Sequence, residues 1–289
     1  MADIDVSVLV PTHNRLETLE LSLKSILAQK GVAFEVLVAG DGCPREVAGI
    51  VDALGDDRIR FFDLPKAPGV GYANRNVALR EAKGSLIAYA SDDDLMTADH
   101  LANLAAHFRR DRVQWAYSRP LYVRPDGLIL PVFTNLENPV MLRQYLREFT
   151  LIYMSAIMHR RSVFDDVGFW PEDVLRHGDV VFWRRILTKF GPGGVACERR
   201  ASSFHFSADW RDDDDRWPVR LAMLRALAMT TARWPECLRL HDSGDASQQA
   251  ELWARLSERP ERSVRQLRHG IDLLQDRLAW NLSTMPAFR

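Results

Sequence analysis

The sequence predicts an α/β fold in which a mainly parallel sheet is covered by helices on both faces. Short apolar runs bounded by Gly, Pro or Asp alternate with segments whose apolar residues recur every three or four positions. This alternation repeats over residues 1–110 and is typical of a Rossmann-like layer. The full chain of 289 residues is long enough to bury a large core.

The first elements follow directly from local patterns. Val6–Val10 is apolar at every position except Ser7 and is followed by Pro11, so we expect a buried strand. Leu16–Ala28 carries leucines and an isoleucine at helical spacing, and Gly31 ends that helix. Phe34–Ala39 is a second apolar run and predicts the neighbouring strand.

The same alternation continues through the first 110 residues. We expect in turn a helix at Pro44–Leu54, a strand at Ile59–Leu64, a helix at Tyr72–Ala82 before Gly84, a strand at Leu86–Ala90 and a helix at Ala98–Phe108. In a parallel sheet of this kind, the carboxyl ends of the strands carry the ligand. Polar residues follow three of these strands directly, which indicates a binding edge there.

The second half of the chain changes character. We expect a hairpin of Trp115–Val123 and Leu128–Phe133, helices at Val140–Phe149 and Val180–Phe190, and a strand at Ala201–Phe206. From Trp217 onward the pattern is helical, with a boundary near Asp209–Asp215. We therefore predict a main domain at 1–209, with halves at 1–110 and 111–209, and a helical extension at 210–289.

Composition excludes several classes of protein. With 38 basic and 39 acidic side chains, the net charge of -1 gives no electrostatic footprint for nucleic acid. No apolar run approaches the ~18–20 residues that span a bilayer. The three cysteines are far apart and in no metal-binding spacing, which favours a reducing, cytoplasmic location.

Three adjacent carboxylates, Asp92, Asp93 and Asp94, follow the fourth expected strand. Like charges at the end of a buried strand repel one another unless a cation lies among them. Oxygen ligands suit Mg²⁺ or Mn²⁺, which bind one or two carboxylates together with substrate phosphates. The alternative is a solvated turn that caps the next helix. Position alone favours the metal site and leaves both interpretations open.

Four other residues have a chemical and a structural interpretation. Asp41 lies between two glycines and could bind a base or cap the next helix. Arg75 could bind a phosphate or form a surface ion pair. Asp179, at the start of an expected helix, could be a general base or simply interact with the helix dipole. His205, between two phenylalanines, is by itself more typical of a core histidine than of a ligand.

As an ordered set, these segments resemble the family 2 glycosyltransferases of the GT-A fold. The resemblance runs from about Val6 to about Phe206 and rests on Val8–Arg15, Phe34–Gly42, Gly69–Asn76, Ile87–Asp94 and Gly178–Trp183. It implies a Rossmann-like GT-A nucleotide-diphospho-sugar transferase fold, with residues 1–110 on the donor side and 111–209 on the acceptor side. The implied reaction is inverting transfer of a sugar, from a UDP-sugar by preference, to an acceptor hydroxyl.

The resemblance also implies roles for particular residues. The donor would be bound by Pro11, Thr12, Asn14, Arg15, Asp41, Arg75, Asp92 and Asp93. Mn²⁺ or Mg²⁺ would be held by Asp93, Asp94 and His205, and Asp179 would be the general base. The chain departs from the family pattern at Gly40, Ser91 and Gly178, where acidic residues are usual.

Two other functions stay open from the sequence. A sugar nucleotidyltransferase would use similar carboxylates, although Pro11–Arg15 does not resemble its glycine-rich loop. A non-catalytic nucleotide-sugar-binding protein would explain the three departures. The expected acceptor is a glycan, a lipid-linked molecule or a small molecule. The sequence leaves a homo-oligomer open and favours packing of the helical tail over contact with a membrane surface.

Overall fold

The computed structural model describes residues 4–132, 134–147, 152–206, 234–241 and 245–284. The chain divides into two compact units. The first comprises Met1–Leu121 and Val132–His205, and the second comprises Tyr122–Pro131 and Phe206–Arg289.

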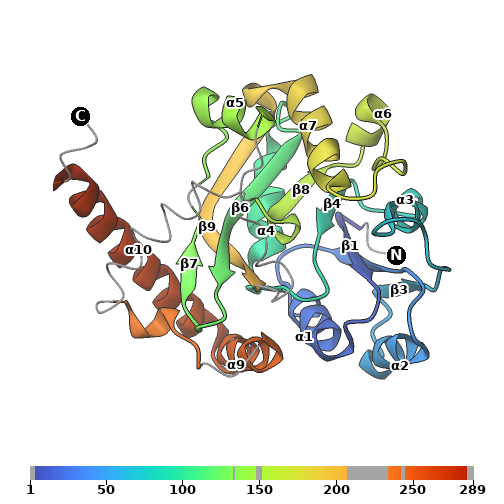
Figure 1. The fold of residues 1–289 in the computed structure, drawn as a ribbon, viewed down its shortest axis with the longest axis horizontal. Helices are drawn as coiled ribbons and strands as arrows, with labels where there is room; N and C mark the ends of the chain where they lie inside the picture. Colours follow the sequence, from blue (N-terminus) through green and yellow to red (C-terminus); the bar gives the residue numbers. More distant parts are fainter. Residues whose placement is uncertain (1–3, 133, 148–151, 207–233, 242–244, 285–289) are drawn as a thin grey trace. The chain divides into compact units, whose positions relative to one another are not determined.

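The first unit alternates strands and helices as the sequence predicts (Figure 1). Its elements are β1 (Val6–Thr12), α1 (Leu16–Leu27), β2 (Phe34–Gly40), α2 (Arg45–Leu54), β3 (Ile59–Phe62), α3 (Tyr72–Arg80), β4 (Leu86–Tyr89), β5 (Leu95–Met96), α4 (His100–Ala105), η1 (Ala106–Arg109), β6 (Trp115–Val123), α5 (Pro139–Arg147), η2 (Met154–Ala156), β8 (Ile157–Arg160), α6 (Val163–Val167), α7 (Gly178–Phe190), η3 (Pro192–Gly194) and β9 (Val195–Phe206). The last residues of β6 and β9 belong to the second unit.

The sheet has the order β3-β2-β1-β4-β8-β6-β9-β5. The four strands expected from the first 90 residues are present, and β3, β2, β1 and β4 are parallel. Antiparallel pairs join β8 to β4 and to β6, and β5 to β9. The parallel strands β3, β2, β1 and β4 all lie in the half of the chain that was expected to bind the donor.

Two core clusters cover the two faces of this sheet. In β1, Val6, Val8 and Val10 pack on one side with buried residues of α1, α2 and α4, while Leu9 joins the other side. The cluster that contains Leu9 also includes Trp170 and, from α7, Phe182 and Trp183. Because side chains alternate along a strand, a strand such as β1 that is buried on both sides must be covered on both faces of the sheet. Figure 1 shows α1 and α2 below the parallel strands and α3 above them.

The element boundaries differ from the sequence-based expectations in three ways. The helix expected at Ala98–Phe108 is α4 followed by the short 3₁₀ turn η1. The strand expected at Ala201–Phe206 begins six residues earlier, since β9 starts at Val195. The short strands β5 and β8 were not expected, because two and four residues are too few to show a period. The predicted ends Phe133 and Phe149 lie outside the described residues.

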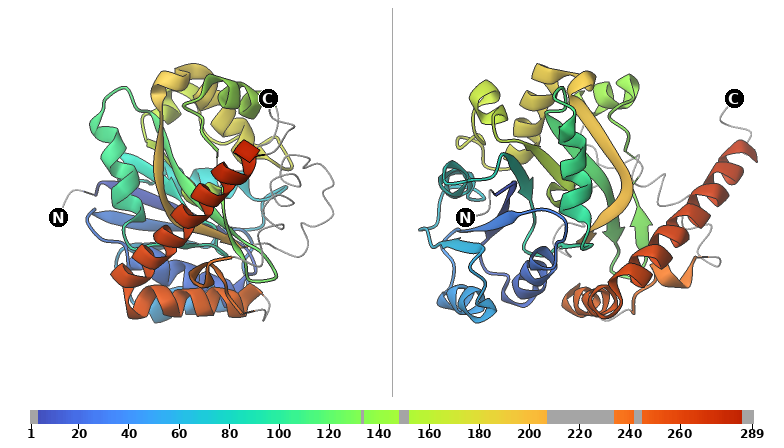
Figure 2. Two further views of the ribbon diagram at one scale, coloured as in Figure 1. Left: turned by 90° about the vertical axis from the view of Figure 1, so that its left-hand side faces the viewer. Right: turned by 180° about the vertical axis from the view of Figure 1, so that it is seen from behind.

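The described residues of the second unit include the tip of the predicted hairpin and three helical segments. These are β7 (Ile129–Pro131), η6 (Glu236–Leu238), α9 (Asp245–Glu258) and α10 (Pro260–Thr284). Gly127 has a φ of +79°, and an added Cβ would lie 2.1 Å from the Leu240 carbonyl, so the hairpin turn requires glycine. Figure 2 shows α10 as one long helix. Trp217 and the boundary predicted at Asp209–Asp215 lie outside the described residues.

Within the described part of the chain, no helix has the length and apolar character needed to cross a membrane.

Gly84 fixes the approach of β4 to β1. Its N–H donates to the Ser7 hydroxyl at 2.8 Å, and an added Cβ would lie 2.5 Å from the Ser7 backbone nitrogen. We expect Gly84→Ala to lower the free energy of unfolding by about 1–3 kcal/mol, because backbone cannot move aside for the methyl group. Urea denaturation measures this change.

Gly49→Ala is the matched control for that substitution. Gly49 lies exposed inside α2, and an added Cβ meets nothing within 4 Å. We expect it to raise stability by up to about 1 kcal/mol through helix propensity. Equal loss of stability in both variants would contradict the role assigned to Gly84.

Candidate functional site

The polar loops predicted to bind the donor leave the sheet at one edge. Thr12 pairs with Gly40 across β1 and β2, and Leu9 pairs with Tyr89 across β1 and β4. These strands are parallel neighbours, so the loops that follow them lie side by side. The Asp41 N–H donates to the Thr12 carbonyl at 3.0 Å and continues this pairing beyond the sheet.

The three consecutive aspartates are buried at this edge rather than forming a solvated turn. Asp92, Asp93 and Asp94 are 7%, 7% and 2% exposed. The Arg15 guanidinium lies against Asp93 and 3.6 Å from Asp92. The Ser91 hydroxyl donates to Asp93 Oδ1. One arginine therefore faces the carboxylates of both Asp92 and Asp93. Ser91 stands where family 2 glycosyltransferases usually have an acidic residue, and it donates a hydrogen bond to Asp93.

Asp94 is held by two residues from distant parts of the chain. The Ser155 hydroxyl donates to one of its oxygens, and His205 Nδ1 lies 2.9 Å from the other. The His205 ring stacks on Tyr153, with ring centroids 3.7 Å apart. The structure thus brings His205 to the loop of Asp92, Asp93 and Asp94, which we call the carboxylate loop, although His205 and Asp94 are 111 positions apart in the sequence.

Burial governs the protonation of Asp92. Its pKa is raised above the ordinary value, first because burial disfavours the charged carboxylate and also because Asp94 lies near. The Arg15 guanidinium and the Thr12 hydroxyl act in the opposite direction and do not compensate fully. Ionisation of Asp92 therefore costs free energy that these two neighbours do not fully offset.

The Asp41 carboxylate accepts hydrogen bonds from the loop that leads into α3. Its Oδ2 accepts from Lys66 Nζ at 2.5 Å, and its Oδ1 accepts from the Ala67 N–H and from Asn74 Nδ2, each at 2.7 Å. An added Cβ on Gly71 would lie 2.6 Å from the same carboxylate, so the loop can close on it only with glycine there. Binding of a base by Asp41 stays a prediction, and would require one of these partners to move.

Arg75 lies between the predicted donor and acceptor residues. Its guanidinium covers the rings of Tyr72 and Trp170, at 4.9 Å and 5.1 Å from the ring centroids. Burial lowers its pKa, whereas the charges of Asp179, Asp92 and others act to raise it. Its Nε is buried without a hydrogen-bond partner among the described residues. A buried N–H of this kind is costly unless a ligand accepts from it.

Asp179 stands in the first turn of α7. It is half-buried, and its carboxylate makes no hydrogen bond or ion pair with another described residue. The preceding His177 has a φ of +59°, the one non-glycine residue with positive φ among those described. Backbone strain of this kind is often stored at functional sites.

Gly178 departs from the family pattern because Tyr72 occupies the space. The Gly178 N–H donates to the Tyr72 hydroxyl at 2.8 Å, and an added Cβ would lie 2.7 Å from the Tyr72 ring. Gly40 is similarly confined, since an added Cβ would lie 3.0 Å from the Phe61 ring. Both glycines are therefore required by local packing.

The remaining predicted residues contribute less to the geometry. Pro11 is half-buried in β1, and Asn14 is exposed in the loop after it. The sequence does not single out Lys66, Asn74 or Ser155. Asn74 lies inside the Gly69–Asn76 segment and could have been found there, but nothing local marks Ser155, which meets Asp94 across 61 positions.

The described residues by themselves do not form a complete metal-binding site. Among them, no three His, Cys, Asp or Glu side chains are grouped so that they could enclose a metal ion. Mg²⁺ and Mn²⁺ often take one or two carboxylates and complete their shell with substrate phosphates and water. The carboxylate loop fits that mode of binding, since its oxygens are buried, close together and incompletely neutralised.

Comparison with protein families gives one match. The model of glycosyl transferase family 2 matches residues 7–168, which include the parallel strands and the carboxylate loop. An uncharacterized glycosyltransferase of Bacillus subtilis, YwdF, is 25% identical over 210 residues, 72% of this chain and 78% of that protein. The chain spans between 38% and 78% of the length of the first four curated relatives that it matches.

A relative with a stated activity and a solved structure extend the comparison. WfaP of Escherichia coli, a UDP-Glc:α-D-GlcNAc-diphosphoundecaprenol β-1,3-glucosyltransferase, is 24% identical over 184 residues, 64% of this chain and 70% of that protein. TarS 1–349 of S. aureus in complex with UDP-GlcNAc is 17% identical, with a TM-score of 0.58 over 85% of this chain and 69% of that one. These matches confirm the α/β fold class predicted from the sequence.

The burial of Asp92 generates a pH-dependent prediction. Because its folded pKa is raised, the wild-type protein loses stability as the pH rises through the range above about 4. Asp92→Asn removes the titrating group and keeps its size. We expect its thermal midpoint to exceed that of the wild type at pH 7, and the difference to shrink towards pH 4.

Thermal denaturation between pH 4 and 7.5 measures this effect. Asp52→Asn, at an exposed position of α2, is the control and should show no such trend. A stabilisation of Asp92→Asn that is the same at every pH would show that packing, not charge burial, is the cause.

Proposed function

The chain belongs to glycosyl transferase family 2, and from that premise we propose that it transfers a sugar from a UDP-sugar to an acceptor hydroxyl with inversion. The main observation in support of this proposal is the position of Arg75. Its charge interacts with Asp41, Asp92 and Asp179, which stand on three separate segments of the chain. One cation thus lies among the groups predicted to bind the nucleotide, hold the diphosphate and activate the acceptor.

The donor would lie across the ends of β1, β2 and β4. Thr12, Asn14 and Asp41 would face the base, and Pro11 shapes the strand end beneath it. The unpartnered Nε of Arg75 would donate to the diphosphate, and Arg15 could exchange a carboxylate for a phosphate. The TarS structures with UDP and with UDP-GlcNAc support the choice of a uridine nucleotide.

The carboxylate loop would hold Mn²⁺ or Mg²⁺ through Asp93 and Asp94, with His205 beside them. When bound, the cation supplies Lewis-acid stabilisation of the departing diphosphate. Ser91 and Ser155 would keep Asp93 and Asp94 oriented through the hydrogen bonds that they already donate.

Asp179 would be the general base. Its carboxylate has no partner to displace among the described residues, and the preceding turn fixes it at the start of α7. It would take the acceptor hydroxyl proton while that oxygen bonds to the anomeric carbon. The bond from that carbon to the diphosphate breaks at the same time, and the nucleoside diphosphate leaves. This in-line displacement inverts the anomeric carbon.

The proposed acceptor is a glycan or a lipid-linked sugar. WfaP, which by its description acts on a diphosphoundecaprenol-linked sugar, supports this choice. A cytoplasmic location stays a prediction from the cysteine content.

Asp179→Asn tests the general base. We expect transfer to fall by about 10²–10⁴-fold with donor affinity unchanged, because the amide keeps the shape and cannot accept the proton. Release of UDP from a panel of UDP-sugars in the presence of acceptors measures turnover. Asp173→Asn, exposed in the loop before α7, is the control. Full turnover by Asp179→Asn would exclude the assigned role.

Nucleotide and metal dependence test the donor site. We expect UDP with Mn²⁺ to raise the thermal midpoint more than dTDP or GDP, and Asp93→Asn to abolish the Mn²⁺-dependent part. Asp52→Asn should retain it. Absence of any shift with all three nucleotides would favour a protein without a donor site. Release of pyrophosphate from UTP and a sugar phosphate would instead identify a nucleotidyltransferase.

A further inference from the structure

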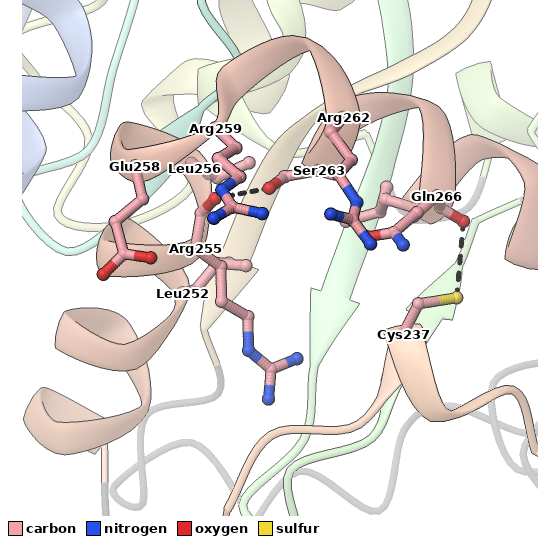
Figure 3. Close-up of a pocket in the computed structure, with 10 residues that line it drawn as sticks. Cys237, Leu252, Arg255, Leu256, Glu258, Arg259, Arg262, Ser263 and Gln266 are labelled. Carbon is pink, nitrogen blue, oxygen red and sulfur yellow. Dashed lines mark hydrogen bonds between the residues drawn. The ribbon is translucent and has the colours of Figure 1, made fainter.

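The second unit contains a pocket that the proposed reaction does not use. It has a volume of about 350 Å³ and lies between η6, α9 and α10 (Figure 3). Its wall includes Arg255, Arg259 and Arg262, which come from the end of α9 and the start of α10. Its volume falls within the range of about 300–1,000 Å³ that is usual for small-molecule sites.

The three arginines differ in their partners. Arg255 pairs with Glu251 and donates to the Arg239 carbonyl at 2.7 Å, so its charge is already neutralised. The exposed side chains of Arg259 and Arg262 make no ion pair or hydrogen bond with another described residue. Both guanidinium groups are therefore without an anionic partner among the described residues. Figure 3 shows both guanidinium groups on the pocket side of the chain.

The rest of the pocket combines an apolar floor with polar groups. Leu252, Leu256 and Leu267 are buried beneath the arginines. The Ser263 hydroxyl donates to the Arg255 carbonyl at 2.5 Å, which ties the start of α10 to the end of α9. The pocket is therefore set in a packed helix–helix junction.

The start of α10 strengthens the positive potential. This helix of 25 residues begins at Pro260, directly between the two arginines. The partial positive charge of a helix N-terminus favours an anion in its first turn. It adds to the two guanidinium groups. Glu261 in the first turn of α10 and Glu258, the acidic side chain among the lining residues, act against it.

We propose that this pocket binds a phosphate ester. Arg259 and Arg262 would each donate to the phosphate oxygens, and the leucine floor would contact the carbon part of the ligand. A phosphate monoester is favoured over a carboxylate because its two charges match two guanidinium groups that have no ion-pair partner in the part of the chain that the structure describes. The ligand would be either a soluble sugar or polyol phosphate or the phosphate headgroup of a lipid.

Binding of phosphate esters to the full chain tests this site. Calorimetric titrations would use inorganic phosphate and glycerol 3-phosphate in metal-free buffer, and flotation would use phosphatidylcholine vesicles with and without phosphatidic acid. We expect Arg259→Gln and Arg262→Gln each to weaken binding by about tenfold or more. Arg265→Gln is the matched control, since Arg265 is exposed on α10 and does not line the pocket. It should leave binding within about twofold of the wild type.

The two sources of phosphate give different results in this design. Binding of glycerol 3-phosphate identifies a soluble ester, and binding restricted to vesicles that contain phosphatidic acid identifies a lipid headgroup. Equal weakening of binding by all three substitutions would show that the ligand responds only to the net charge of the protein, and this result would overturn the proposal. So would an absence of binding to every probe by the wild type. The proposed transfer reaction is independent of both outcomes, because UDP binding to the first unit is measured separately.

Discussion

The repulsion among three buried aspartates at the end of β4 is the constraint around which the site is built. Groups from several neighbouring segments oppose it: Arg15 before α1, Ser91 in the loop after β4, Ser155 in η2 and His205 in β9. The compensation is incomplete, since burial still raises the pKa of Asp92. A divalent cation bound among these carboxylates would favour their charged forms.

The three departures from the family pattern have local physical causes. Gly178 makes room for the Tyr72 ring, and Gly40 is confined by Phe61. Ser91 replaces a charge with a hydrogen bond to Asp93. An acidic residue at Ser91 would add a fourth carboxylate to a loop that already lacks sufficient positive charge. These substitutions are therefore consistent with a working site and do not by themselves indicate lost activity.

Some polar groups of the proposed site have hydrogen-bond partners within the protein, and others have none among the described residues. The oxygens of Asp41 and Asp94 already take part in internal hydrogen bonds, which orient these two carboxylates. The Asp179 carboxylate and Arg75 Nε have no such partners among the described residues. Unsatisfied polar groups cost stability, and their persistence at the junction of several loops is typical of a place where a ligand supplies the missing contacts.

The sequence by itself determined the parallel half of the sheet and the residues at its edge. Short segments rich in apolar residues such as Val6–Val10, and carboxylates placed directly after strands, are local features that need no knowledge of distant contacts. Tertiary structure alone decided which distant groups meet those carboxylates. The short strand β8 carries no periodic signal, yet it follows η2 and sets Ser155 against Asp94. His205 resembles a core histidine in sequence, and becomes a partner of Asp94 because Phe204 beside it pairs with Leu95, the residue after Asp94. Periodicity describes a chain within one element, whereas strand order and register act across a hundred residues, and that is why pairings of this kind appear only in the fold.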